Sequence, residues 1–270
     1  MSSRRRRAGI AAASLAWAGL LAPSLAASDL PSELKARGTL RVLGVLVNQP
    51  RDFLSAEAGV GFDREVLEGF AGLHKLKLEL VPVPRWDGLV PALKEGRGDL
   101  IAGRFTITDA RRKEIDFTQE VFPTRNVVMS RSPHPAVTTL EQLRAEKVGT
   151  VKGTSMADAI AAAGVPRSNV DDSFPTGTLP DALRSGKASA VVLGVEHAIQ
   201  ERRADPAIQL GLYLGPPTSL AYGVRKEDVG LLAALDEYIG NLRRTPTWSR
   251  LVVKYFGDDA PEILRKARSE

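Results

Sequence analysis

The sequence predicts an α/β fold with two lobes, because short buried strands alternate with amphipathic helices in two separate runs. The first run occupies residues 39–102 and the second residues 147–193. This alternation is typical of parallel sheets that are covered by helices. The chain has 270 residues, of which 43% are hydrophobic and 26% charged, a globular composition with enough length for two lobes.

The first run begins with a β-branched and leucine-rich strand at residues 39–47. Asp63 stands at the N-cap position of the helix that follows, whose apolar residues have helical spacing. A strand at residues 76–83 and a helix that opens at Trp86 come next, and a short buried strand at residues 99–102 completes the run. Strand and helix therefore alternate as they do in βαβ units.

The second run repeats this order. A strand at residues 147–151 leads through the turn Gly153-Thr154-Ser155 into a helix, and further strands are expected at residues 170–174 and 188–193. The segments 92–101 and 182–191 share a helix, a glycine stop, a basic residue and a buried strand, although two generic βα units can look alike by chance. Beyond the second run we expect strands at 208–214 and 220–224 with a break at Pro216-Pro217 between them, and then a long amphipathic helix at 231–242. The apolar segment 247–256 should close the core, and residues 261–270 should form a terminal helix.

The stretch from Gly98 to Arg111 has the pattern of an anion-binding segment. A loop at residues 103–108 leads from a buried strand into a helix at Asp109, with Arg111 just inside that helix. Free backbone N–H groups at a helix start, the Thr106 hydroxyl and the fork-shaped guanidinium can together hold a small carboxylate. The alternative interpretation makes Arg111 one of the solvated charges of the segment Ala-Arg-Arg-Lys-Glu.

Residues 1–27 have the pattern of a cleavable secretory signal. Four arginines at residues 4–7 precede a short apolar run at 8–21, and small residues suited to cleavage follow, up to Ala26 and Ala27. An amphipathic N-terminal helix of the fold is the alternative. No later segment has the run of roughly eighteen apolar residues that a transmembrane helix needs, and without any cysteine a lipidated cysteine is excluded. We expect a periplasmic protein, exported by the Sec or the twin-arginine route.

Charge and motif content argue against several classes of function. The formal charge is +5, but residues 1–26 hold four of the basic residues and no acid, which leaves 33 basic against 32 acidic residues. Such a nearly neutral body lacks the basic surface of a nucleic-acid-binding protein. The histidines, His74, His134 and His197, lie far apart without a second metal-ligating residue at the usual spacing, so no metal site is expected. The glycines form neither a phosphate loop nor a dinucleotide motif, so no cofactor is expected.

Several short motifs follow one another in a characteristic order. They are Gly61-Phe62-Asp63, residues 86–93 (WDGLVPAL), residues 98–103 (GDLIAG), Thr106-Ile107-Thr108, Arg111 with residues 115–118 (IDFT), and residues 148–154 (VGTVKGT). As an ordered set they resemble the family-3 bacterial extracellular solute-binding proteins, the polar amino-acid receptors of ABC importers. The resemblance covers roughly residues 40–257.

The resemblance implies a fold of the periplasmic-binding-protein type, with two Rossmann-like α/β lobes joined by two hinge strands and the ligand in the cleft between the lobes. Lobe 1 would comprise residues 28–123 and 220–270, and lobe 2 residues 124–219. The hinge would lie at residues 122–126 and 217–220, and the cleft would close around its ligand. The implied function is capture of a small carboxylate or amino-acid ligand by a monomeric receptor and its delivery to an inner-membrane ABC permease.

The same resemblance assigns roles to individual residues. The arginine at the position of Arg111 grips the α-carboxylate of the ligand, assisted by residues matching Thr106, Thr154 and Ser155. The backbone at Gly103 contributes a further contact. A residue matching Trp86 flanks the ligand side chain, although Trp86 as an ordinary core aromatic is the alternative.

Two departures from the family pattern leave the ligand class open. The aspartate that normally accepts from the ligand ammonium is replaced by Gly194, and the aromatic residue usual near residues 48–49 is missing. Phe53 could substitute for the aromatic residue. Either Glu196 replaces the aspartate, although it could also be a solvated residue of a helix start, or the ligand is an organic acid without an ammonium group.

Two other functions compete with transport. The first is a periplasmic lyase of the cyclohexadienyl dehydratase type, which shares this fold and would need a general acid in the cleft. Glu196 and His197 lie close enough to the predicted cleft to be considered for that role, but the acidic pair expected of the lyase is not reproduced. The second is a sensory or partner-binding protein without a permease. We expect a binding protein with no catalytic residue.

Overall fold

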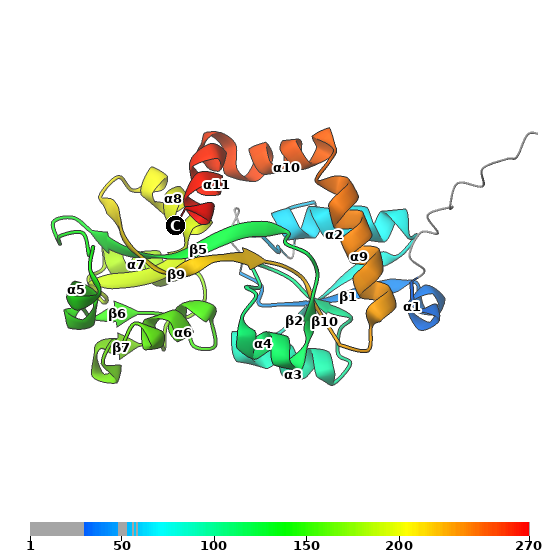
Figure 1. Ribbon diagram of the computed structural model, residues 1–270, viewed down its shortest axis with the longest axis horizontal. Coiled ribbons are helices and arrows are strands. Elements are labelled where there is room, and N and C mark those ends of the chain that lie inside the picture. Colours follow the sequence, from blue (N-terminus) through cyan, green and yellow to red (C-terminus); the bar gives the residue numbers. More distant parts are fainter. Residues whose placement is uncertain (1–29, 48–52, 56, 58, 270) are drawn as a thin grey trace, which may run out of the picture.

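Two five-stranded sheets lie side by side along the long axis of the molecule (Figure 1). The computed structural model describes residues 30–47, 53–55, 57 and 59–269. The predicted signal sequence lies outside the described residues.

The first sheet has the strand order β2-β1-β3-β10-β4. Its strands are β1 (Thr39–Gly44), β2 (Lys77–Pro82), β3 (Leu100–Ile101), β4 (Asp116–Phe117) and β10 (Gly223–Val224). Strand β1 pairs in parallel with β2 and β3, whereas β10 is antiparallel to β3 and β4. The predicted βαβ order of the first run is therefore confirmed, and a late segment of the chain returns to complete the same sheet.

The second sheet has the order β7-β6-β8-β5-β9. Its strands are β5 (Phe122–Arg131), β6 (Val148–Gly149), β7 (Val170–Asp171), β8 (Ala190–Gly194) and β9 (Ile208–Leu220). Strand β6 pairs in parallel with β7 and β8, and β5 is antiparallel to both β8 and β9. The expected strands of the second run are thus present, although most are shorter than their sequence pattern.

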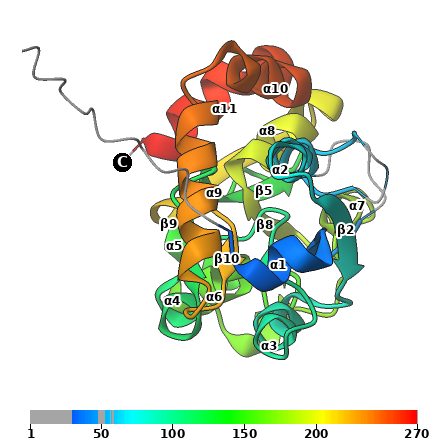
Figure 2. The same cartoon turned by 90° about the vertical axis from the view of Figure 1, so that its right-hand side faces the viewer.

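Helices cover both faces of the two sheets (Figures 1 and 2). Those packed around the first sheet are α1 (Ser32–Arg37), α2 (Phe62–Leu73), α3 (Leu89–Lys94), α4 (Asp109–Glu114), α9 (Val229–Leu242) and α10 (Pro246–Phe256). Those beside the second sheet are α5 (Leu140–Ala145), α6 (Ser155–Ala162), α7 (Leu179–Arg184), α8 (Val195–Ala204) and α11 (Ala260–Arg268). Single 3-10 turns occupy Trp86–Gly88, Arg167–Asn169 and Gly257–Asp259.

The helix–glycine–strand unit noted in the sequence occurs in both lobes. Helix α3 stops before Gly96 and helix α7 before Gly186, and each glycine adopts a positive φ, 73° and 70° respectively. Glycine adopts this backbone conformation without the strain that a side chain would cause. In each lobe the chain then returns through the core strand, β3 or β8.

The long strands β5 and β9 pair with each other over almost their whole length, from Phe122 opposite Leu220 to Arg131 opposite Ile208. Strand β9 continues through Pro216 and Pro217, but its pairing with β5 is irregular there. Thr218 lies opposite Thr124 and Leu214 opposite Asn126, so the expected break takes the form of a bulge within one strand. Strand β9 lies at the edge of its sheet, where a proline without an N–H group removes no ladder hydrogen bond to a second neighbour. The lobe boundaries and the hinge positions stay predictions. The last helix, α11, packs against β5, β9 and α8.

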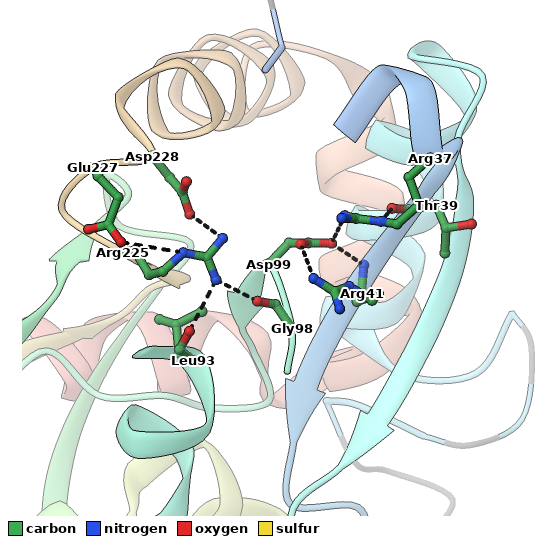
Figure 3. Close-up of polar contacts among 9 residues, drawn as sticks. All are labelled: Arg37, Thr39, Arg41, Leu93, Gly98, Asp99, Arg225, Glu227 and Asp228. Atoms are coloured by element: carbon green, nitrogen blue, oxygen red, sulfur yellow. Dashed lines mark hydrogen bonds and ion pairs between the residues drawn. The ribbon is translucent and has the colours of Figure 1, made fainter. Parts of the chain in front are cut away.

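A cluster of charged residues closes the end of the first sheet that lies away from the loop after β3 (Figure 3). Asp99 receives hydrogen bonds from the backbone N–H of Arg41 at 2.8 Å and from the guanidinium groups of Arg41 and Arg37 at 3.0 and 2.5 Å. Arg225 donates to the carbonyl oxygens of Leu93 and Gly98. These contacts fix the amino ends of β1 and β3. They therefore hold in place the strand that leads into the loop at the carboxyl end of β3.

Candidate functional site

A cavity lies between the two lobes, at the carboxyl ends of β3, β6 and β8. It has about 650 Å³ of empty space, open solvent at its mouth included. Lobe 1 contributes Trp86, Arg104, Thr106 and Arg111 to its lining. Lobe 2 contributes mostly apolar side chains, together with the polar side chains of Thr150, Thr154, Ser155, Thr176, Glu196 and His197. A cleft at the strand ends of two α/β sheets is the usual place for a small ligand.

The anion-binding segment folds as its sequence predicts. Helix α4 begins at Asp109, with Thr108 as its N-cap and Arg111 in its first turn. The Thr108 hydroxyl accepts a hydrogen bond from the Arg111 N–H at 3.3 Å. In the loop before it, Gly103 and Arg104 have positive φ angles of 91° and 60°. This reversal turns the chain from the end of β3 toward lobe 2.

Arg111 reaches across the cavity from lobe 1 to lobe 2. Its Nη1 donates to the Thr106 carbonyl at 2.7 Å and its Nη2 to the Gly153 carbonyl at 3.3 Å. The guanidinium lies 4.0 Å from the ring centroid of Phe105, a cation–π contact. Burial lowers the pKa of Arg111 to about 10, so the group stays charged at neutral pH. No carboxylate of the described residues forms an ion pair with it, which leaves its charge available to an anion.

The turn before α6 faces this guanidinium. Thr154 is the N-cap of α6, and its hydroxyl accepts from the Ala157 N–H at 3.2 Å while donating to the Val151 carbonyl at 2.7 Å. Ser155 donates to the Thr106 hydroxyl at 3.1 Å across the cleft. The hydroxyl groups of both lobes therefore meet beside Arg111.

Trp86 forms part of the cavity wall. Its Nε1 donates to the Thr176 hydroxyl of lobe 2 at 3.0 Å, which is a second polar contact across the cleft. The ring is partly exposed rather than buried in the core. Trp86 therefore has the position of a wall residue of the cavity.

Phe53 and Gly103 do not line the cavity. Phe53 is 4% exposed and packs in an aromatic cluster, with ring centroids 5.4 Å from Phe62, 6.1 Å from Phe122 and 5.8 Å from Phe256. Phe53 thus contributes to the core instead of replacing a missing wall residue. The Gly103 N–H donates to Asp63 at 3.0 Å, so it points away from a ligand in the cavity.

The Asp63 side chain holds the loop between β3 and α4 by hydrogen bonds, a role that its sequence context does not indicate. Helix α2 begins one residue before it, at Phe62, so the expected N-cap role is wrong. One carboxylate oxygen accepts from the N–H groups of Gly103 and Arg104, at 3.0 and 3.1 Å, and the other from the Tyr222 hydroxyl at 3.2 Å. Complete burial raises the pKa of Asp63 to about 6. These partners lie far away in the sequence, so no local pattern predicts the contact.

Glu196 and His197 lie at the start of α8, on the lobe 2 side of the cavity. Glu196 is 2% exposed, and its Oε2 accepts a hydrogen bond from the Thr124 hydroxyl at 2.6 Å. His197 contacts the guanidinium of Arg104 through Nδ1 at 2.9 Å and Glu201 through Nε2 at 3.4 Å. These partners fit a neutral imidazole that accepts at Nδ1 and donates from Nε2. The solvated alternative for Glu196 is therefore wrong.

Arg104 and Thr150 also line the cavity and were not singled out in the sequence. Arg104 stands in the anion-binding segment, one residue after Gly103, so a wider search of that segment would have found it. Thr150 belongs to the motif at residues 148–154 but has no charge or helix-cap pattern to mark it. In the part of the chain that the structure describes, no three potential metal-ligating side chains cluster together. No described helix is long and apolar enough to span a membrane.

The chain is similar in sequence to several known bacterial proteins. The lysine/arginine/ornithine-binding periplasmic protein of Escherichia coli K12 is 26% identical over 73% of this chain and 79% of that protein. The membrane-bound lytic murein transglycosylase F of Desulfosudis oleivorans is 27% identical over 76% of this chain. The chain spans only 46% of the length of that second relative.

Solved structures share the fold. The ancestral amino acid-binding protein AncCDT-1, described as a precursor of cyclohexadienyl dehydratase, superimposes with a TM-score of 0.74 and 25% identity. The match covers 83% of this chain and 98% of that chain. The predicted two-lobed α/β fold of the periplasmic-binding-protein type is thereby confirmed. Residues 42–258 match the sequence pattern of the bacterial extracellular solute-binding proteins, family 3. The chain therefore belongs to the family-3 bacterial extracellular solute-binding proteins.

Proposed function

We propose that this protein is a periplasmic receptor that captures a small carboxylate-bearing solute, an amino acid or a related organic acid, by closure of the two lobes. The observation that carries the proposal is Arg111, a charged guanidinium in the interlobe cavity without a carboxylate partner among the described residues. The Thr106 hydroxyl beside it, which accepts from Ser155, supplies a further donor. Together they offer the charge-assisted, forked hydrogen bonds that a carboxylate accepts.

The second part of the proposal is delivery of the solute to an inner-membrane ABC permease. It is supported by the signal-like pattern of residues 1–27 and by the periplasmic amino-acid-binding proteins among the relatives. Deletion of the gene should abolish high-affinity uptake of the ligand by whole cells. Unchanged uptake in the deletion strain would favour the sensory alternative, a binding protein without a permease.

The binding site is tested by Arg111→Ala. Loss of two charge-assisted hydrogen bonds should weaken the binding of a carboxylate ligand at least ~100-fold. Isothermal titration calorimetry measures the affinity, after a thermal-shift screen of amino acids and organic acids has found a ligand. Arg112→Ala is the matched control, because Arg112 is exposed on the same helix and does not line the cavity. Equal affinity of Arg111→Ala and wild type would refute the carboxylate site.

A lyase of the cyclohexadienyl dehydratase type is the second candidate function. It is favoured by Glu196, whose side chain lines the cavity and in its protonated form could donate a proton to a leaving hydroxyl. Incubation with a hydroxylated cyclohexadienyl carboxylate, followed by detection of the aromatic product, separates the two functions. Turnover that is lost in Glu196→Gln would favour the lyase; binding without turnover would favour the receptor.

A further inference from the structure

The side of the interlobe cavity that lobe 2 provides is mostly apolar. Six apolar residues line it, which we call the apolar wall: Val151, Met156, Leu179, Pro180, Val192 and Leu193. They come from the segment after β6, from the first turns of α6 and α7, and from β8, so the wall extends across several elements. Among the lobe 2 residues of the described lining, Glu196 and His197 are the ionisable ones, and they are neighbours at the start of α8. A ligand in the cavity therefore faces a mostly uncharged surface on this side.

The apolar wall begins beside the proposed carboxylate site. The sulfur of Met156 lies 3.5 Å from the Ser155 hydroxyl oxygen, and this hydroxyl donates to the Thr106 hydroxyl at 3.1 Å. Arg111 in turn donates to the Thr106 carbonyl at 2.7 Å. Methionine has a flexible and polarisable side chain that adapts to apolar partners. A carboxylate held at Arg111 therefore has apolar surface directly beside it.

Most polar side chains that share this lining already have hydrogen-bond partners within the protein. Trp86 Nε1 donates to the Thr176 hydroxyl, which leaves the indole ring as the part of Trp86 that a ligand can contact. The Thr154 hydroxyl both donates and accepts, and both ring nitrogens of His197 have contacts. Thr150 differs, because its hydroxyl has no partner among the described residues. A ligand with several polar groups beyond its carboxylate would give up hydrogen bonds to water here and regain few of them, which is unfavourable.

The chemistry of the wall sets the size of the expected selectivity. Burial of one methylene group of a ligand contributes a factor of about four in affinity. A site built from apolar side chains discriminates against a polar compound of similar shape by roughly 100-fold. A charged group loses more, because an ion gives up more hydration energy than a neutral polar group does.

We propose that the apolar wall selects carboxylate ligands whose remaining part is uncharged and apolar, over polar or charged ligands of the same size. The inference rests on the proposed carboxylate-binding function and narrows its ligand class. It applies to a ligand with an amine and to one without. Val151 and Met156 are the wall residues best suited to a test, because both are only half-buried and tolerate substitution more easily than a core residue.

The test uses two sets of probes, each with a constant head group and a variable chain. The first set is 2-aminobutyrate, norvaline and norleucine, and the second is butanoate, pentanoate and hexanoate. Calorimetry should show that the affinity rises about fourfold with each added methylene group in whichever set binds. In the first set methionine should bind about 100-fold more tightly than glutamine or lysine, and in the second hexanoate about 100-fold more tightly than adipate.

Two substitutions place a polar group on the wall with little change of shape. In Met156→Gln and in Val151→Thr, the preference for methionine over glutamine, or for hexanoate over adipate, should fall at least about fivefold, because the new group can hydrogen-bond to the polar probe. Leu73→Gln is the matched control, since Leu73 is 66% exposed on α2 and does not line the cavity, and it should keep the wild-type preference. Thermal unfolding verifies that each variant is folded.

The outcomes separate this inference from the proposed function. If glutamine, lysine or adipate binds as tightly as its apolar counterpart, while Arg111→Ala still weakens that binding, the apolar selection is overturned and the carboxylate receptor remains. A preference that neither Met156→Gln nor Val151→Thr reduces would also overturn the role of the wall, as would the failure of every apolar probe to bind. If Arg111→Ala leaves the affinity for the tightest probe unchanged, the carboxylate site fails and this inference fails with it.

Discussion

At the scale of single residues, Thr150 is a buried polar group whose environment has a measurable consequence. Its side chain is fully buried, and its hydroxyl has no hydrogen-bond partner among the described residues, although it lines the cavity. An unpartnered buried hydroxyl costs roughly 1–3 kcal/mol of stability. A ligand with a polar group at this position would recover that cost on binding.

Thr150→Val should therefore stabilise the ligand-free protein by about 1 kcal/mol and weaken ligand binding about tenfold. Urea unfolding and calorimetry measure the two effects. Thr118→Val is the matched control, because the Thr118 hydroxyl donates to the Gln119 carbonyl and accepts from the Tyr222 N–H. This control should lose stability, and a similar loss in Thr150→Val would contradict the assignment of an unpartnered hydroxyl.

The sequence predicts cavity residues where a local motif places them. Arg111 lies at the expected helix start, Thr106 in the short loop after β3 and Ser155 in the first turn of α6, so strand and helix patterns were sufficient. Asp63 and Phe53 were misassigned because their partners lie far along the chain. The position of the Glu196 carboxylate beside Gly194 likewise depends on side-chain packing, which a sequence pattern does not specify.

At the scale of elements, the first turn of α2 controls the loop between β3 and α4. Asp63 holds the N–H groups of Gly103 and Arg104, and burial raises its pKa from 3.8 to about 6. Between these two pH values the folded protein keeps the proton that the unfolded chain has lost. The folded state then binds more protons, so the contribution of Asp63 to stability falls as the pH rises from about 4 to about 6.

Asp63→Asn cannot ionise and should remove this pH dependence. Its amide oxygen can still accept from the loop N–H groups, and its amide N–H can donate to Tyr222. Relative to wild type, the variant should gain up to about 3 kcal/mol of stability when the pH is raised from about 4 to about 7. Urea unfolding at both pH values measures the difference. A constant difference between the two proteins would show that Asp63 titrates normally.

The order of strands and helices could be predicted because each element has its own periodicity and stop signal. Helix α4, helix α6 and the core strands begin within a few residues of the expected positions. The expected break at Pro216-Pro217 is a bulge within one strand, and only the sheet order reveals that β9 is an edge strand that can hold two prolines. Strand pairing across the molecule, such as β10 between β3 and β4, has no local signal.

At the scale of the whole molecule, the lobes are in contact across the cavity. Ser155 donates to Thr106, Trp86 to Thr176, and Arg111 to the Gly153 carbonyl. The described arrangement is thus a closed one, in which the residues proposed to bind a ligand also hold the lobes together. Closure and binding should therefore be coupled, because each contact requires both lobes to be in place.

Gly153 lies close to Asp87 of the opposite lobe, so a side chain added at residue 153 tests whether closure of the lobes is needed for binding. Gly153 has φ 79°, and a Cβ atom there would lie 2.6 Å from the backbone nitrogen of Asp87 on the other lobe. Gly153→Ala should keep the lobes apart, weaken binding at least about tenfold, and prevent the ligand-induced decrease in the radius of gyration measured by small-angle X-ray scattering.

Gly186→Ala is the control, because Gly186 has φ 70° but no atom lies within 4 Å of the position that a Cβ would take there. Both alanines carry the backbone strain of a left-handed conformation, which costs roughly 1–2 kcal/mol, so both variants should lose similar stability. Only Gly153→Ala meets the opposite lobe, and only it should lose affinity and compaction. If both variants close normally around the ligand, contact between the lobes at Asp87 is not required for binding, and the residues around Arg111 alone account for the affinity.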